Sequence, residues 1–575
     1  MYMDSARHSG HAFPPLEPQL TPTSSSTPAS IKPDHSDPLG PSTSESSAPM
    51  KLSPSPHQFE AALGTSANNL AQSLNNLLET KIDETGHLHE NLVEPAMDHM
   101  FDQANLYDQP ISYDNLLSSE KLPDFITRPV VPDSFNLQGN HKKYLNYFYH
   151  DFARVILPLP PSPRYNPARE ILLAYGKNHN YLLSAILACG AMQSHRKTKD
   201  PQDEKSYCSY LSICLRLLST ILADEAKVNK SVEPMLLTVM LLTSYTAISL
   251  LQKWRPHLRA AKDLLSTYAP FSEDPRYSRH NSYVIAFCRN WYMSIENIAG
   301  LTAPSGGVLK DDRELELVMY DLPYMKKYWE SMLLCREDGF NYVYGYSNTL
   351  GVALQKLIKS IKTFKTMKKP RTLSIFTLYD LVSDFRKEEQ FEIISKTGIV
   401  PKNHFMHPEN DLRPPPGFEA LSPEAIQKIE YQDGSYDYIS WYDICHQSYV
   451  IAAYILITSN LGGYPKRHPS VQELVQKAFS LFPFLRAKGM IEYQALIIQV
   501  SMYFVGLNCV YKADRDLVAR FFENLRQLHS AAASFTLERL KCKWDKYDEL
   551  HKDDREIIHD DNDFDDDDLD DVMNY

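Results

Sequence analysis

A long series of helix-period segments, from about residue 136 to residue 544, limits the possible folds more than any other feature of this sequence. Apolar side chains there recur at three- and four-residue intervals, whereas the two-residue alternation of half-buried strands is rare. No clean linker separates two cores. The pattern therefore predicts one large all-α domain. The predicted helices span residues 167–193, 204–224, 231–251, 256–268, 281–300, 346–366, 373–387, 423–430, 441–461, 469–484, 491–511 and 514–544.

The longest predicted break in this series is a loop over residues 395–422, which contains a Pro-Pro-Pro-Gly run. Ser422 and the Pro that follows it supply N-cap and first-turn signals, so the next helix is placed at 423–430.

Two uncharged stretches, Met235–Leu251 and Tyr493–Tyr511, could be mistaken for membrane spans. The first is slightly short for a span, and both carry polar side chains that are costly in lipid. Helices that are apolar on nearly all sides also occur in the middle of large bundles. We therefore predict two buried core helices and no membrane contact.

The two ends of the chain differ in composition from this helical region. Residues 1–60 hold eleven prolines and thirteen serines, too polar a mixture to offset the entropy of ordering. Residues 545–575 hold fifteen Asp or Glu and three Lys or Arg, so they carry −12 of the total net charge of −13. The expected organisation is a disordered segment over 1–135, a helical domain over 136–544 and an acidic tail over 545–575.

Four apolar side chains are spaced through the acidic tail: Phe564, Leu569, Val572 and Met573. This mixture is typical of acidic activation segments, in which charge keeps hydrophobic anchors in water and available to a coactivator groove. The tail is therefore predicted to contact a coactivator or the general transcription machinery through these four residues. A purely solubilising tail is the alternative. Residues 98–117 form a second acidic-aromatic candidate.

Five stretches of the helical region have a distinctive sequence. They are Tyr-Asn-Pro-Ala-Arg-Glu-Ile-Leu-Leu at 165–173, Tyr-Leu-Leu-Ser-Ala-Ile-Leu-Ala-Cys-Gly-Ala at 181–191, Trp-Arg-Pro-His-Leu-Arg-Ala-Ala-Lys-Asp-Leu-Leu at 254–265, Asp-Gly-Phe-Asn-Tyr-Val-Tyr-Gly-Tyr-Ser at 338–347 and His-Gln-Ser-Tyr-Val-Ile-Ala-Ala-Tyr at 446–454. Together and in this order they resemble the regulatory region of fungal zinc-cluster transcription factors, and within that family the yeast activators of lysine-biosynthesis genes. The resemblance implies a nuclear transcriptional activator of RNA polymerase II genes, with lysine-biosynthesis genes as candidate targets.

The sequence departs from this family at its DNA-binding element, which would ordinarily contain six cysteines on two zinc ions. The eight cysteines here include no C-x₂-C pair, and the two nearest, Cys208 and Cys214, have five residues between them. Tetrahedral zinc needs shorter loops. Zinc is therefore expected only if a cysteine cluster lies upstream of Met1, and no residue of this chain is predicted to bind DNA. A tethering partner would then bring the chain to promoters.

A cationic stripe marks the Trp-Arg-Pro-His stretch. Arg255, Arg259 and Lys262 lie at i, i+4 and i+7 of the helix predicted over 256–268, beside an apolar face. The resemblance implies α-aminoadipate semialdehyde as an effector, whose carboxylate would need a cation. These three residues are the candidate effector site. A solvated helix face, or ion pairs with neighbouring helices, is the alternative.

Sequence motifs for catalysis are missing: there is no H-E-x-x-H, G-x-G-x-x-G, phosphate-binding loop or G-x-S-x-G. The prediction is a non-enzymatic regulator without a cofactor. Two alternatives stay open. One is a helical scaffold or adaptor without DNA-binding activity, and the other is an enzyme whose site is assembled from distant helices.

Overall fold

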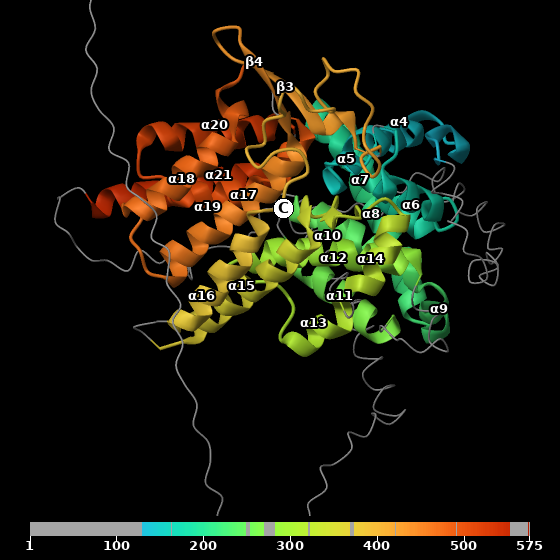
Figure 1. Cartoon of the computed structure of the whole chain (residues 1–575). Helices are drawn as coiled ribbons and strands as arrows, with labels where there is room; N and C mark the ends of the chain where they lie inside the picture. The colour runs from blue at the N-terminus through green and yellow to red at the C-terminus, as the bar shows by residue number, and fades with distance from the viewer. Residues whose placement is uncertain are drawn as a thin grey trace, which may run out of the picture. The chain divides into compact units, whose positions relative to one another are not determined.

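The computed structural model describes residues 129–551 and Met573, except 163, 249–252, 270–281, 320–321, 369–372, 420, 490–491 and 529. These residues form helices joined by loops, with two small antiparallel sheets of two strands each (Figure 1). The predicted all-α class is confirmed. Most of residues 1–135 and 552–572 lie outside the described residues.

The α-helices lie in chain order from the first to the last described segment. They are α4 (Gly139–Tyr147), α5 (Ala153–Ile156), α6 (Pro167–Gly176), α7 (Asn180–Thr198), α8 (Pro201–Leu222), α9 (Glu225–Lys230), α10 (Val232–Ala247), α11 (Arg255–Tyr268), α12 (Tyr283–Thr302), α13 (Asp312–Met319), α14 (Leu322–Ser331), α15 (Asn348–Thr366), α16 (Ile375–Glu388), α17 (Trp441–Ile455), α18 (Pro469–Leu481), α19 (Gln499–Leu507), α20 (Lys512–Gln527) and α21 (Ala531–Leu550).

Short helical turns and four strands complete the fold. The 3₁₀ turns are η3 (Pro132–Phe135), η6 (Pro423–Ala425), η8 (Pro483–Arg486) and η9 (Tyr493–Leu496), and the π turns are η4 (Phe148–Phe152) and η7 (Leu456–Leu461). The strands are β1 (Phe340–Asn341), β2 (Tyr346–Ser347), β3 (Ile426–Glu430) and β4 (Tyr436–Ser440), and β1 pairs with β2 and β3 with β4.

Helix starts follow the capping signals in the sequence. The side chain of Asn166 accepts a hydrogen bond from the backbone N–H of Arg169, and Pro167 occupies the first turn of α6. Asp200 caps α8 in the same way. A Pro in the first turn costs nothing because its missing N–H would have no intrahelical partner there. Helix α11 begins at Arg255, with Pro256 in its first turn as predicted.

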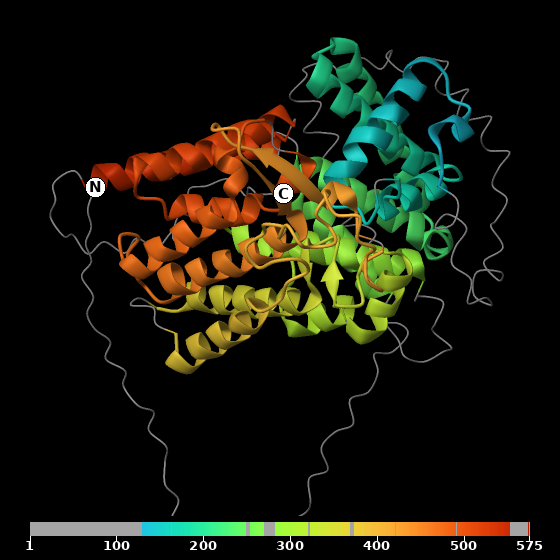
Figure 2. The same cartoon turned by 45° about the horizontal axis from the view of Figure 1, so that its top comes forward.

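Helix α12 is the structural centre, because it is buried along almost its whole length and contacts α10, α11, α14, α15 and α19. The N-terminal helices gather around α7, which packs on α4, α8 and α10. The C-terminal helices gather around α17 and α19, which pack on each other and on α18 and α21. Both views place these two groups on opposite sides of the central helices (Figures 1 and 2).

The predicted helix at 423–430 is wrong. Ser422 does act as a cap, but only for the 3₁₀ turn η6, after which the chain becomes strand β3. Each β3 residue pairs with one in β4 across a turn that contains Gly434, which has a φ of 84°. This hairpin packs Ile429 and Ile439 into the core. Tertiary pairing therefore overrode the capping signal.

Other helix boundaries also differ from the prediction. The segment predicted at 167–193 breaks after Gly176 into α6 and α7, and α4, α13 and α14 were not predicted. Helix α21 continues to Leu550, six residues into the segment assigned to the acidic tail. The long loop prediction holds, because no helix lies between α16 and η6 in the described residues.

The two uncharged stretches are core elements. Helix α10 is buried from Pro234 to Ala247, and α19 is buried from end to end. Among the helices of the described ranges, none combines the length and apolarity that crossing a membrane requires.

Candidate functional site

Two of the three predicted effector cations hold a neighbouring loop. The guanidinium of Arg255 donates to the carbonyl oxygens of Gly306 (2.8 Å) and Gly307 (3.0 Å) and lies over the Trp254 ring. The Lys262 ammonium pairs with Glu314 of α13 at 2.8 Å and is almost completely buried. These contacts attach the loop between α12 and α13, and α13 itself, to α11.

Arg259, the third cation, is exposed on α11. Arg255, Arg259 and Lys262 therefore lie on one helix, as their spacing predicted, but none of them lines the cavity described below. The structure gives Arg255 and Lys262 intramolecular partners of the kind considered as the alternative to effector binding.

A buried carboxylate holds the same loop from its other side. Both oxygens of Glu296 accept backbone hydrogen bonds, from Val308 and Leu309, each at 2.9 Å. A Cβ on Gly307 would lie 2.0 Å from Oε1 of Glu296, so only glycine fits there. Burial raises the pKa of Glu296 to about 7 in spite of these hydrogen bonds.

The raised pKa of Glu296 predicts a pH-dependent stability. The folded chain holds this proton more tightly than the unfolded chain, so the stabilising contribution is complete below the unfolded pKa of 4.5 and is lost as pH rises through about 7. We expect about 3 kcal/mol from this group, and a shallower slope of unfolding free energy against pH in Glu296→Gln. Urea unfolding between pH 4.5 and 8 measures the slope.

The exposed Glu473→Gln, on α18, is the control and should keep the wild-type slope. Asp443 adds a slope of the same sign, because burial raises its pKa from 3.8 to about 6, so Glu296→Gln should reduce the slope without abolishing it. Identical slopes in wild type and Glu296→Gln would show that Glu296 does not titrate in this range.

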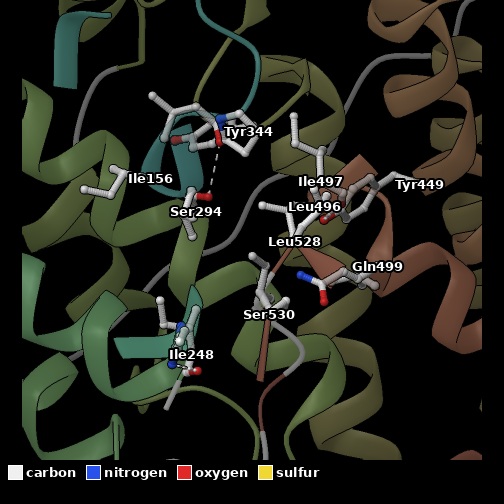
Figure 3. Close-up of a pocket in the computed structure, with 16 residues that line it drawn as sticks. Ile156, Ile248, Ser294, Tyr344, Tyr449, Leu496, Ile497, Gln499, Leu528 and Ser530 are labelled. Carbon is white, nitrogen blue, oxygen red and sulfur yellow. Dashed lines mark hydrogen bonds between the residues drawn. The ribbon is translucent and has the colours of Figure 1, made fainter. Parts of the chain in front are cut away.

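A cavity of about 50 Å³ lies where the two helix groups meet. This is larger than the 10–15 Å³ that one water molecule needs. Its walls are mainly aliphatic, with a few polar side chains between them (Figure 3). The polar or aromatic lining residues are Arg196, Ser294, Tyr344, Tyr449, Gln499 and Ser530. Apolar walls with a few convergent polar groups are typical of ligand sites.

The segment 338–347 places Tyr344 in this cavity. Strands β1 and β2 form a hairpin in which the buried amide of Asn341 donates to Asn290 and Asn348 and accepts from the backbone of Val343. Gly345 has a φ of 75°, and a Cβ there would lie 2.5 Å from the side chain of Ile497. Glycine is therefore required twice, for backbone conformation and for space.

Helix α17 fixes the hairpin through His446, whose Nδ1 accepts the backbone N–H of Ser347 at 3.2 Å. Its Nε2 therefore carries the proton and donates to the Glu388 carbonyl at 3.0 Å. Burial lowers the pKa of His446 to about 4, so the ring is neutral at physiological pH. One helical turn further along, Tyr449 lines the cavity and donates to the Ile497 carbonyl.

Arg196 supplies a half-buried positive charge at the cavity. It lies near the C-terminal end of α7 and donates to the carbonyl of Ile248 at 2.6 Å. Burial lowers its pKa to about 10, so the guanidinium remains charged at neutral pH. A partly desolvated guanidinium is a favourable partner for a ligand carboxylate.

Gln499 supplies an unsatisfied acceptor at the cavity. Its side chain is 1% exposed, and within the described structure its Oε1 atom has no hydrogen-bond partner. In Figure 3 the nitrogen of its amide points toward Ser530. A buried acceptor without a donor costs about 1–3 kcal/mol. A ligand or water that donates to Oε1 would recover that cost.

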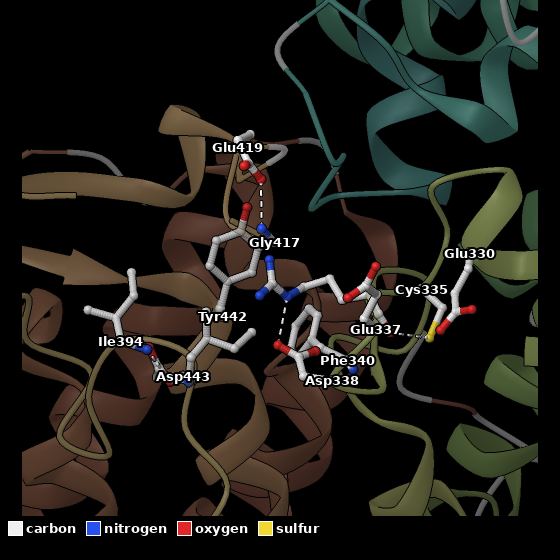
Figure 4. A network of polar contacts seen from close by, with 12 residues as sticks. Glu330, Cys335, Glu337, Asp338, Phe340, Ile394, Gly417, Glu419, Tyr442 and Asp443 are labelled. Atoms are coloured by element: carbon white, nitrogen blue, oxygen red, sulfur yellow. Dashed lines mark hydrogen bonds and ion pairs between the residues drawn. The ribbon is translucent and has the colours of Figure 1, made fainter. Parts of the chain in front are cut away.

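A second polar network holds the long loop against α17 (Figure 4). The Asp443 carboxylate lies next to the Ile394 backbone and accepts the N–H groups of Ile393, Ile394 and Ser395. The Ser422 N–H donates to the Tyr442 hydroxyl at 2.8 Å, so the end of the loop is also held.

The described residues contain no group of three or more His, Cys, Asp or Glu side chains placed to hold a metal ion. Six of the eight cysteines are buried, Cys208 is half-buried and Cys542 is exposed.

Comparison with known proteins identifies the family. A family model described as the fungal specific transcription factor domain matches residues 143–566, about three quarters of the chain. The chain belongs to this family. The lysine biosynthesis regulatory protein LYS14 of Saccharomyces cerevisiae is 27% identical over 518 residues, which cover 84% of this chain and 62% of the relative. This chain thus matches less than two thirds of that relative's length. No solved structure shows significant similarity to this chain.

The fungal transcription factor domain brings together stretches that the sequence showed only as separate matches. The 338–347 and 446–454 stretches meet at the cavity through Tyr344 and Tyr449. Sequence reasoning missed Arg196 and Gln499. Arg196 looked like one of several basic residues at a helix end, and the burial of Gln499 depends on helix packing. No sequence signal identified either residue.

Of the four predicted coactivator contacts in the acidic tail, Phe564, Leu569 and Val572 lie outside the described residues. Met573 is described, and it is fully buried within the hydrophobic core of the domain. In this conformation, Met573 is not available to a coactivator. Residues 98–117 also lie outside the described residues.

Proposed function

We propose that this member of the fungal transcription factor family is an activator whose helical domain responds to a small metabolite bound in the cavity. The observation that carries the proposal is that Arg196 and Gln499, whose Oε1 atom is unsatisfied, both line one mainly apolar cavity. Together they match a ligand with an anionic end and a hydrogen-bond donor. The proposal moves the ligand site from Arg255, Arg259 and Lys262 to the cavity that Ser294 and Ile298 of α12 line.

The ligand chemistry follows from the residues and from the relative. An α-amino acid would place its carboxylate on Arg196 and its ammonium group on Gln499, with its aliphatic chain against Ile248 and Leu528. The name of the yeast relative supports a role in regulating lysine biosynthesis. α-Aminoadipate semialdehyde, an amino acid with an aldehyde end, is the candidate effector.

At a promoter, two further contacts would be needed, one with the transcription machinery and one with DNA. The acidic tail would act as an activation segment in the nucleus, contacting a coactivator or the general transcription machinery when its apolar residues are released. DNA contact would come from a tethering partner or from a zinc cluster upstream of Met1, since the eight cysteines of this chain have no zinc-cluster spacing.

Ligand-dependent stabilisation of the purified full chain tests the cavity. Aminoadipate, a stable analogue of the semialdehyde, should raise the melting temperature of wild type, because a ligand that binds only the folded state stabilises it by mass action. Gln499→Leu removes the acceptor at nearly constant volume, and it should weaken binding by about tenfold or more. Differential scanning calorimetry over a ligand series measures both effects.

Arg259→Met is the matched control, because it removes an exposed cation from the predicted stripe and should leave ligand binding unchanged. Two results would contradict the cavity proposal. One is a wild-type chain that aminoadipate does not stabilise, and the other is Gln499→Leu binding as tightly as wild type. Loss of binding in Arg259→Met alone would return the site to α11.

A further inference from the structure

Helix α16 exposes an unusual row of apolar side chains. Ile375, Phe376 and Tyr379 are 72%, 77% and 70% exposed, the highest values among the large hydrophobic residues of the described structure. Val382 follows at 38%. Ile375, Tyr379 and Val382 lie at i, i+4 and i+7, so they form one stripe along the helix, and Phe376 lies beside it. We call these four residues the α16 stripe.

The α16 stripe is distinct from the face by which α16 joins the fold. Leu381 and Phe385 are buried, on the opposite side of the helix. Helix α16 is therefore apolar on two faces, and only one of them packs against the core. Single exposed apolar residues are ordinary, but four on one helix face mark an interaction site.

The chemistry around the stripe indicates what kind of partner it fits. Residues 348–388, which include α15, α16 and their connection, contain nine Lys or Arg and three Asp or Glu. Arg386 continues the stripe at i+11 from Ile375 and is exposed. An apolar stripe in a segment with six more positive than negative side chains fits an acidic peptide that carries aromatic or aliphatic anchors.

We propose that the α16 stripe docks the acidic segment 560–572 of the same chain. That segment contains nine Asp and no Lys or Arg, with Phe564, Leu569 and Val572 spaced among the carboxylates. Apolar anchors would contact the stripe, while the carboxylates face the surrounding cations. The two segments are complementary in charge, and both carry apolar side chains.

The two ends of the tail favour this occupant over a separate protein. Helix α21 ends at Leu550, and Met573 is buried in the core of the same domain. The segment between them is therefore attached to the domain on both sides. Such a tether gives an effective concentration of about a millimolar, which makes a weak contact sufficient.

A second copy of α16 is a poorer fit. Residues 348–388 contain nine Lys or Arg and three Asp or Glu, so two copies of this segment would bring like charges together. In a parallel pair, equal charges would face each other along the whole helix. Like charges at an interface are repulsive, so the net positive charge of residues 348–388 opposes self-association.

Photocross-linking in the full chain tests the docking directly. Phe564→p-benzoylphenylalanine places a photoreactive group in the tail, and mass spectrometry locates the side chains it reaches. The expected cross-links fall on residues 371–387 within a single chain at every protein concentration. The double substitution Ile375→Asp and Phe376→Asp removes two apolar contacts and adds like charge, so it should lower their yield by about tenfold or more.

Leu412→Asp is the control, because Leu412 is 56% exposed on the long loop and its replacement also exchanges an exposed apolar side chain for a carboxylate. It should leave the cross-link yield unchanged. Cross-links that map elsewhere on the domain would overturn the proposal, and so would cross-links between chains. Equal cross-link yields in the double variant and the control would also overturn the proposal, because the apolar side chains of the α16 stripe would then contribute nothing to the contact. Displacement of the tail by duplex DNA with no effect of the double substitution would assign the surface to nucleic acid instead.

Discussion

Replacing Gly190 by Ala is expected to destabilise the folded chain by about 3 kcal/mol, although the same change inside a helix ordinarily stabilises it by about 1 kcal/mol. Gly190 lies in α7 where that helix crosses α4. A Cβ there would lie 2.0 Å from the carbonyl oxygen and 2.7 Å from the carbonyl carbon of Tyr144. These are backbone atoms, so relief requires the two helices to move apart and the surrounding core to loosen.

Urea unfolding of Gly190→Ala and Gly351→Ala, compared with wild type, measures this effect. Gly351 is the matched control because it is also a helical glycine, in α15, and its added Cβ would meet only aromatic side-chain atoms at 3.7 Å or more. Gly351→Ala should be neutral or stabilising, by up to about 1 kcal/mol. If both variants shift the midpoint in the same direction, close approach of α4 to α7 does not decide the result.

Replacing Asp443 by Ala is expected to cost about 4 kcal/mol. The carboxylate is 2% exposed and accepts three backbone N–H groups and the hydroxyl of Ser440, so its removal leaves several buried donors without partners. Because these donors belong to the start of the long loop, the loop should also lose its attachment to α17.

Chemical unfolding gives the stability change, and limited proteolysis reports whether the loop at 393–395 is released. Asp443→Asn should lie between wild type and Ala, since the amide retains one acceptor oxygen. Asp437→Ala, on β4, removes a half-buried carboxylate with a single hydrogen bond from the hydroxyl of Tyr431, and it should cost about 1 kcal/mol. Equal losses in the Asp443 and Asp437 variants would contradict the role given to the Asp443 network.

Features that depend on neighbouring residues could be predicted from the sequence, whereas features that depend on contacts between distant segments could not. Helix α11 begins at Arg255, one residue before its predicted start, and its apolar face is buried as the periodicity required. The helix predicted at 423–430 failed because pairing of β3 with β4 outweighed the local cap. Local signals are decisive only where no distant segment competes for the same backbone hydrogen bonds.

The candidate site shows the same division. The i, i+4, i+7 spacing correctly placed Arg255, Arg259 and Lys262 on one helix, but spacing contains no information about the partners of a side chain. Arg255 holds a loop and Lys262 holds helix α13, and both partners lie about fifty residues further along the chain. Arg196 and Gln499 are about three hundred residues apart in sequence, and only the packing of two helix groups brings them to one cavity.

The sequence by itself determined the helical class of this protein, its acidic tail and its resemblance to fungal transcription factors, because periodicity, composition and short motifs are properties of neighbouring residues. Only the tertiary structure decided which polar groups are buried together, that Met573 lies in the core and that the α16 stripe remains exposed. Burial and desolvation depend on contacts between residues far apart in the chain, and no local pattern encodes them.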